Sequence, residues 1–146
     1  RETKVELNSS TDFKSNFKTN ATALMAPTRL YYPYLKKLLE TDLLNGISHI
    51  TGGGITGNVP RMLPEELSAN INKDLFFKDD IFEWFKNLSN ISNDEMYKTF
   101  NCGLGLVVSV AKENYDKFID VIQNENLEIF EVGLVEAANS VKCKIS

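Results

Sequence analysis

The chain has few of the residues that bind transition metals or form disulfides. Its 146 residues include two cysteines, Cys102 and Cys143, and one histidine, His49. A structural zinc site takes about four Cys or His ligands at characteristic spacings, so we expect no metal site in this chain. Two cysteines do not make a disulfide framework in a domain of this size. A reducing compartment, the cytoplasm, is therefore expected.

Long apolar runs and clusters of positive charge are missing as well. No apolar stretch approaches the roughly 20 residues that a membrane-spanning helix needs, and no secretory signal pattern is present. The formal net charge is −4, and no lysine run is longer than Lys36-Lys37. A chain of this charge has no basic field that attracts nucleic acid. We expect neither a membrane nor a nucleic acid as a partner.

Glycine is concentrated at one place. Four glycines, Gly52, Gly53, Gly54 and Gly57, fall within six residues, after an apolar approach and before a short stretch that ends at Pro64. The run fits neither G-x-x-x-x-G-K-[ST] nor G-x-G-x-x-G, so the standard nucleotide motifs do not apply. Consecutive N–H groups in such a loop can converge on an anion, but a tight structural turn explains the same residues equally well. The polar residues around it are His49, Thr51, Thr56, Asn58 and Arg61.

Three residues outside the glycines each leave a functional and a structural reading open. Arg29, beside Thr28 and an expected helix start, could bind a phosphate or carboxylate in a bidentate fashion, or make a surface ion pair. Asn101 could bind a ligand amide or hydroxyl, or cap a turn. His49 could transfer protons, although a role in holding the loop is slightly favoured. Cys102 has no histidine nearby in sequence, so a nucleophilic thiol has little support.

Hydrophobic periodicity outlines one domain with helices and strands. With 42% hydrophobic and 25% charged residues, the chain is long enough for one domain with its own core. Residues 1–22 are polar and are expected to be a linker or arm, which leaves 23–146 as the domain. Helices are expected at residues 33–44 with Gly46 as C-cap, 58–63, from Asp79 or Asp80 through Leu88, after a capping box at Ser92–Glu95, and at 113–123 with Tyr115, Phe118, Ile119 and Ile122 inward. Strands are expected at 47–50, 67–71, 104–110, 127–135 and 141–145, the last at a sheet edge.

The polar clusters and their spacing resemble one family. The blocks, in order, are Ala26-Pro-Thr-Arg-Leu-Tyr, Ile47-Ser-His-Ile-Thr-Gly-Gly-Gly, Asn58-Val-Pro-Arg-Met-Leu-Pro, Trp84, and Glu95-Met-Tyr-Lys-Thr-Phe-Asn-Cys-Gly-Leu-Gly. This order resembles the C-terminal domain of phosphoribosylformylglycinamidine cyclo-ligase, also called aminoimidazole ribonucleotide synthetase, from about Leu24 to Val135. The chain departs from the family at Gly57, where an acidic residue is usual. Any contact of that carboxylate is missing or moved here.

The resemblance implies an α+β fold with a mixed β-sheet flanked by helices. Enzymes of the family have two domains, form a homodimer, and use ATP and Mg²⁺ to close the imidazole ring of a purine precursor. Most ATP and metal contacts are made by an N-terminal domain, so this chain resembles the substrate-side lobe, inactive alone. The resemblance implies catalytic roles for His49 and Arg61, and contacts to a phosphorylated substrate from Thr28, Arg29, Thr51, Gly52, Gly53, Gly54, Asn58 and Asn101.

Two other functions stay open at this point. A non-catalytic interaction domain or ligand-sensing domain could retain the fold without the activity. Selenophosphate synthetase and thiamine-phosphate kinase belong to the same ATP-binding superfamily. The block Met96-Tyr-Lys-Thr-Phe-Asn argues against those two enzymes.

Overall fold

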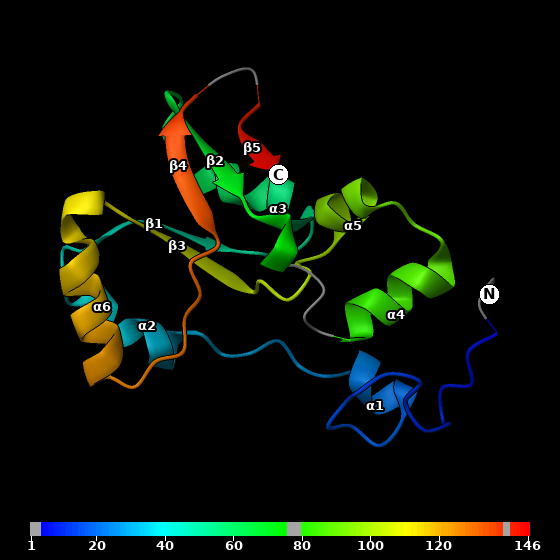
Figure 1. The fold of residues 1–146 in the computed structure, drawn as a ribbon. Coiled ribbons are helices and arrows are strands. Elements are labelled where there is room, and N and C mark those ends of the chain that lie inside the picture. Colours follow the sequence, from blue (N-terminus) through cyan, green and yellow to red (C-terminus); the bar gives the residue numbers. More distant parts are fainter. Residues whose placement is uncertain (1–3, 76–79, 139–140) are drawn as a thin grey trace.

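The fold is α+β, as expected, and is built on two small sheets (Figure 1). The structure is a computed structural model that describes residues 4–75, 80–138 and 141–146. No helix among these residues is long and apolar enough to cross a bilayer. The helices are α1 (Asn20–Leu24), α2 (Tyr32–Leu39), α3 (Gly54–Asn58), α4 (Asp80–Ser89), α5 (Asn93–Thr99) and α6 (Tyr115–Asn124), and the strands are β1 (Leu44–His49), β2 (Leu67–Ile71), β3 (Leu106–Val110), β4 (Gly133–Ala137) and β5 (Cys143–Ile145).

The two sheets differ in strand direction. One sheet pairs β1 with β3 in antiparallel register, with His49 opposite Leu106. The other has the order β4-β2-β5, in which β4 runs antiparallel and β5 parallel to β2. This second sheet is therefore mixed, with β5 at its edge, which confirms both expectations.

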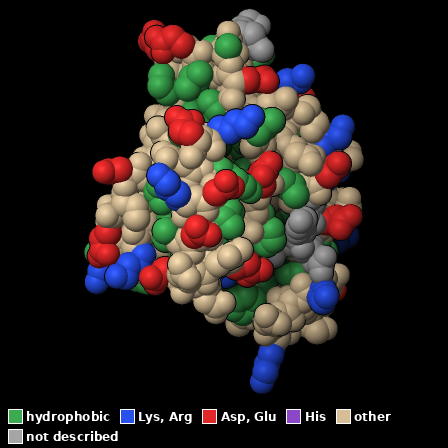
Figure 2. Space-filling view, turned by 60° about the vertical axis from the view of Figure 1, so that its left-hand side comes forward, with side chains coloured by type: hydrophobic (Ala, Val, Ile, Leu, Met, Phe, Trp, Pro, Cys, Tyr) green, Lys and Arg blue, Asp and Glu red, His purple; other side chains and the backbone are tan. Residues whose placement is uncertain are grey.

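Apolar side chains pack in two clusters that hold these sheets in place. The larger cluster includes Ile55, Val59 and Met96, which are almost fully buried where α3 packs on α5. The smaller one joins Leu38 of α2 to Phe118 and Ile122 of α6. Figure 1 shows α2 and α6 beside the β1–β3 pair, with α4 and α5 at the other end of the molecule. Figure 2 shows acidic and basic side chains interspersed over one face.

The helix expected at residues 33–44 is wrong at its C-terminal end. Helix α2 ends at Leu39, and the Thr41 hydroxyl donates to the Leu38 carbonyl at 2.7 Å just beyond it. Gly46 is a residue of β1 and not a helix cap. A Cβ at residue 46 would lie 2.8 Å from the Met62 carbonyl oxygen. Leu44, expected at the end of this helix, instead pairs with Val110 of β3, and local periodicity does not report that contact.

Two expectations near the C-terminus are also wrong. The strand expected at 127–135 begins only at Gly133, and Leu127 instead packs against the smaller apolar cluster. Tyr115 is 42% exposed and not inward, and its hydroxyl lies 3.1 Å from Oε2 of Glu131. A tyrosine at the first position of a helix can reach solvent and a polar partner, so its apolar ring does not decide its direction.

The remaining elements follow the sequence more closely. The predicted ranges are confirmed to within a few residues for strands β1, β2, β3 and β5 and for helix α6. A 3₁₀ turn at Val59–Met62 occupies the expected 58–63 segment. Ser92 caps α5 by accepting from the Glu95 N–H at 3.3 Å. The Glu95 carboxylate accepts from the Thr99 hydroxyl and not from the Ser92 N–H, so only the Ser92 half of the expected capping box forms. Of the two caps considered for α4, Asp79 lies outside the described residues.

The polar N-terminal segment is organised around one buried side chain. Asn20 is completely buried, and its amide donates to the Glu6 carbonyl at 3.2 Å and the Ser9 hydroxyl at 3.1 Å. Phe13 lies against Trp84 of α4, with the ring centroids 4.9 Å apart. The segment therefore contacts the rest of the chain. The boundary expected near residue 22 stays a prediction.

Candidate functional site

A surface cavity gathers residues from four separate segments of the chain, one of which is α4. It has a volume of about 290 Å³ and lies where the segment before α2, the end of β1 and the turn after α5 meet. Four of the residues predicted to form the site line it: Thr28, His49, Thr51 and Asn101. The turn, the strand end and the loop come together because β1 pairs with β3 directly behind them.

Aromatic rings form much of the cavity wall. Tyr31, Phe82 and Phe100 line it, and the Tyr31 ring meets His49 edge-on with centroids 5.5 Å apart. Tyr31 fits only because residue 105 is glycine, since a Cβ there would lie 2.7 Å from the Tyr31 Cζ. Sequence reasoning did not assign these rings to the site. The signal in the sequence was position: Tyr31 and Phe100 lie inside two of the blocks that carry the resemblance, and Phe82 lies two residues before Trp84.

Asn101 is part of a turn as well as the cavity. Its Oδ1 accepts from the Gly103 N–H at 3.1 Å, and its carbonyl accepts from the Leu104 N–H at 2.9 Å. Residues 102 and 103 of this turn have left-handed φ values of +48° and +93°. The side-chain oxygen of Asn101 therefore caps this turn, which is the structural one of its two predicted roles.

The three consecutive glycines have different surroundings. Gly52 and Gly53 are exposed, whereas Gly54 is buried beneath the backbone of α5. A Cβ at residue 54 would lie 2.6 Å from the Lys98 carbonyl carbon and 2.8 Å from the Thr99 nitrogen, and φ there is +59°. A Cβ at Gly52 would meet nothing within 4 Å. Packing thus requires glycine at position 54, while nothing in the fold requires it at position 52.

Asn58 is buried at the centre of this loop. Its Nδ2 donates to the carbonyls of Thr51 at 3.3 Å, Gly52 at 3.2 Å and Gly54 at 2.7 Å. Its Oδ1 accepts from Nη1 of Arg61 at 3.1 Å. Asn58 is only 3% exposed and does not line the cavity.

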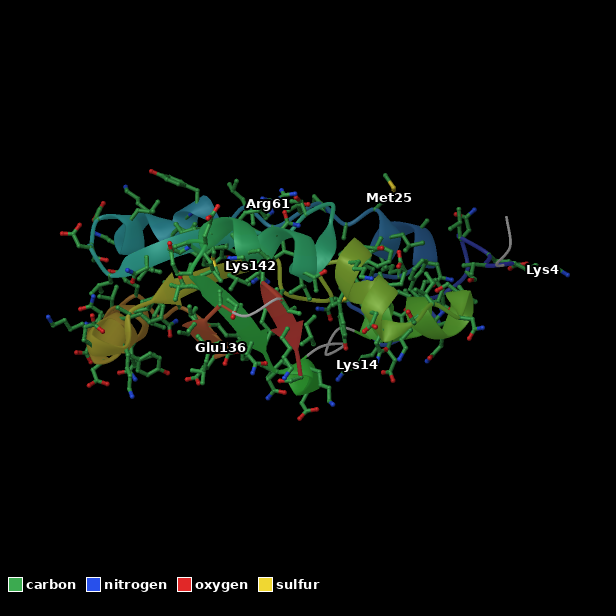
Figure 3. All side chains as sticks on the ribbon, turned by 90° about the horizontal axis from the view of Figure 1, so that it is seen from above. Lys4, Lys14, Met25, Arg61, Glu136 and Lys142 are labelled. Atoms are coloured by element: carbon green, nitrogen blue, oxygen red, sulfur yellow. The ribbon has the colours of Figure 1, made fainter. Side chains whose placement is uncertain are left out.

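Both arginines that were predicted to form the site lie outside the cavity lining. Arg61 is exposed at the end of the 3₁₀ turn, and Figure 3 shows it at the edge of the molecule that carries Met25, with Glu136 toward the opposite edge. Arg29 lies over the ring of Tyr34, with its Cζ 5.9 Å from the ring centroid. Apart from Arg29, the predicted residues thus fall into two groups. One group lines the cavity, and the other forms the glycine loop together with Arg61; Thr51 belongs to both.

Neither cysteine has the properties of a nucleophile. Burial raises the pKa of Cys102 to about 12 and that of Cys143 to about 11. The Cys102 thiol donates to the Met96 carbonyl at 3.6 Å. Both thiols are therefore protonated near neutral pH and serve as small apolar side chains. Within the described ranges, no group of three or more His, Cys, Asp or Glu residues could hold a metal ion.

A second surface cavity, of about 440 Å³, lies between the N-terminal segment and α4. Phe13 and Trp84 line it, and none of the predicted site residues does. The smaller cavity is therefore the candidate site, because chemistry-bearing residues converge there.

Comparison with known proteins identifies the family. Residues 3–146 match the family model described as AIR synthase related protein, C-terminal domain. The phosphoribosylformylglycinamidine cyclo-ligase of Neisseria meningitidis serogroup C is 42% identical over 120 residues, which is 82% of this chain and 35% of the relative. The enzymes of the same name from Cupriavidus pinatubonensis and Methylobacillus flagellatus are 42% and 41% identical over 76% and 78% of the chain, covering 32% and 33% of their own lengths. The chain thus spans about a third of the length of these curated relatives. It belongs to the AIR synthase related family, and it corresponds to the C-terminal domain of that family.

Proposed function

We propose that this chain is the substrate-side lobe of an ATP-dependent phosphoribosylformylglycinamidine cyclo-ligase in purine biosynthesis. The identity of 42% with the Neisseria meningitidis enzyme, over 82% of the chain, supports this proposal. The observation that carries it is the convergence of Thr28, His49 and Asn101, from three distant segments, on one cavity beside the glycine loop. We further propose that a preceding domain binds ATP and Mg²⁺, that the whole enzyme is a cytoplasmic homodimer, and that no metal ligand comes from the described part of this chain.

The lining of the cavity suggests how the substrate is divided between the two groups of residues. Hydroxyl, amide and imidazole groups line the cavity together with aromatic rings, and among the described residues no lysine or arginine does. Such a lining suits the planar, uncharged part of a substrate. The phosphate of the substrate, or the phosphoryl group in transfer, is assigned to the loop of Gly52 and Gly53 with Arg61. Guanidinium and backbone N–H groups are strong donors to phosphate oxygens.

In the proposed reaction, ATP supplies the phosphoryl group that activates the amide oxygen of the substrate. The amidine nitrogen then attacks the activated carbon, the carbon–oxygen bond breaks, and inorganic phosphate leaves. His49 accepts the proton that the attacking nitrogen loses, since a ring nitrogen of imidazole can accept a proton. Arg61 neutralises charge that develops on the phosphoryl oxygens, and the cavity wall fixes the distance between the reacting atoms.

A chimera tests the proposal. This chain replaces the matching third of the Neisseria meningitidis relative, and formation of aminoimidazole ribonucleotide from formylglycinamidine ribonucleotide and ATP is measured. We expect ATP-dependent turnover by the chimera and none by the 146-residue chain alone. His49→Ala should abolish most turnover, whereas Asn124→Ala, an exposed residue at the end of α6, should not change it. A folded chimera that binds substrate without turnover would instead identify a ligand-sensing domain.

A further inference from the structure

The buried amide of Asn58 controls the direction of the peptide groups in the glycine loop. Its two amide hydrogens serve the carbonyls of Thr51, Gly52 and Gly54, and the short 2.7 Å bond goes to Gly54. Its oxygen faces the Arg61 guanidinium, which can only donate. This orientation of the amide pairs every donor with an acceptor.

The direction of these carbonyls determines where the loop N–H groups point. In a trans peptide the C=O and the N–H point in opposite directions, and no peptide bond in the described chain is cis. The Thr51 carbonyl shares its peptide with the Gly52 N–H, and the Gly52 carbonyl shares its peptide with the Gly53 N–H. Because both carbonyls turn toward Asn58, the N–H groups of the two exposed glycines turn away from it.

The same side chain also anchors an exposed cation. Arg61 is exposed, and its Nη1 is 3.1 Å from Asn58 Oδ1. An anchored guanidinium loses less conformational freedom when it binds an anion than one that moves in solvent. Among the described residues, no carboxylate lies within ion-pair distance of Arg61.

We propose that Asn58 is a positioning residue for a phosphoryl group. It directs the Gly52 and Gly53 N–H groups outward and holds the Arg61 guanidinium through its Oδ1, and it does not itself contact the ligand. This proposal rests on the proposed function for the identity of the anion. It changes the role of Asn58 from a substrate-binding residue, as the family resemblance implies, to a residue that acts through others.

Inorganic phosphate is the probe that tests this role. In the ¹⁵N-labelled chain, phosphate should move the amide signals of Gly52 and Gly53 first. Asn58→Ala should raise the phosphate dissociation constant about tenfold, the scale expected when several aligned donors lose their geometry. Asn124→Ala is the matched control and should leave it unchanged. Phosphate binding to Asn58→Ala with wild-type affinity would overturn the proposal.

The double variant separates positioning from a general loss of structure. If Asn58 acts through Arg61, then Arg61→Ala should weaken binding strongly in the wild type and less than about twofold when added to Asn58→Ala. Fully multiplicative effects would show that Asn58 does not act through Arg61. Where Asn58→Ala is unfolded, Asn58→Asp replaces it, because aspartate keeps an acceptor for Arg61 and loses the donor to the carbonyls.

Failure of the proposed function gives a different result. If phosphate moves no signal at Gly52 or Gly53 in the wild type, the phosphate assignment is wrong. The positioning role is then tested without ligand, by the chemical shifts of these two amides and by the side-chain signals of Arg61. Asn58→Ala should move both amide signals and release the guanidinium. Unchanged amide signals and unchanged Arg61 signals would refute the role.

Discussion

Alanine at position 54 should destabilise the protein far more than alanine at position 52. Gly54 has φ +59°, and a left-handed residue with a Cβ costs about 1–2 kcal/mol. The new Cβ would also lie 2.6 Å from the Lys98 carbonyl carbon. Because that atom belongs to the backbone of α5, it cannot rotate away, and overpacking of this kind costs about 1–3 kcal/mol. The two terms give a loss of about 2–5 kcal/mol.

Thermal unfolding followed by circular dichroism measures this difference. For a chain of this size, each kcal/mol shifts the Tm by about 2–4 °C, so Gly54→Ala should lower it by about 4–20 °C. Gly52→Ala is the control, since its Cβ meets no atom within 4 Å, and its Tm should stay within about 2 °C of the wild type. Equal Tm values for the two variants would show that α3 does not pack on α5 as the structure has it.

Three further predictions concern stability and the cavity wall. Gly57→Ala should raise the free energy of unfolding in urea by about 0.5–1 kcal/mol, because its Cβ meets nothing within 4 Å and alanine favours the helix. The raised pKa values of Cys102 (about 12) and Cys143 (about 11) mean that the unfolded chain loses these protons first. The free energy of unfolding should therefore fall as pH rises above about 9, by up to about 1.4 kcal/mol per pH unit for each thiol. The fall should be smaller in Cys→Ala variants, and the same slope in those variants as in the wild type would contradict this prediction. Gly105→Ala should displace the Tyr31 ring from the cavity, which would be seen as a change in its NMR signals. An unchanged Tyr31 spectrum would refute that contact.

Elements with strong local patterns could be predicted from the sequence. The alternating and apolar runs at 67–71 and 104–110 became β2 and β3, and the helix at 113–123 became α6. The ends of elements were less predictable where a distant strand decides them. Leu44, expected in a helix, instead pairs with Val110 of β3, and residues 127–132 are not a strand because only 133–137 pair with β2.

The residue types of the candidate site could be predicted better than its geometry. Glycines, Asn58 and Arg61 in one block allowed either a ligand loop or a tight structural turn, and a linear pattern cannot say which glycine packs against α5. It also cannot show that Asn58 points inward to three carbonyls. Both facts depend on the contact between α3 and α5, whose partners are about 40 residues apart in the chain.

The kcat/KM of Arg61→Ala in the chimera tests most directly the central claim, that the glycine loop and Arg61 hold the phosphoryl group. The value should fall roughly 10²-fold or more, the scale of losing one good charge-stabilising donor. Arg61→Lys should recover only part of the loss, because an ammonium does not reproduce the bidentate geometry of a guanidinium. The Tm should change little, since Arg61 is exposed. A normal kcat/KM for Arg61→Ala would contradict the claim and would move the anion site to Arg29.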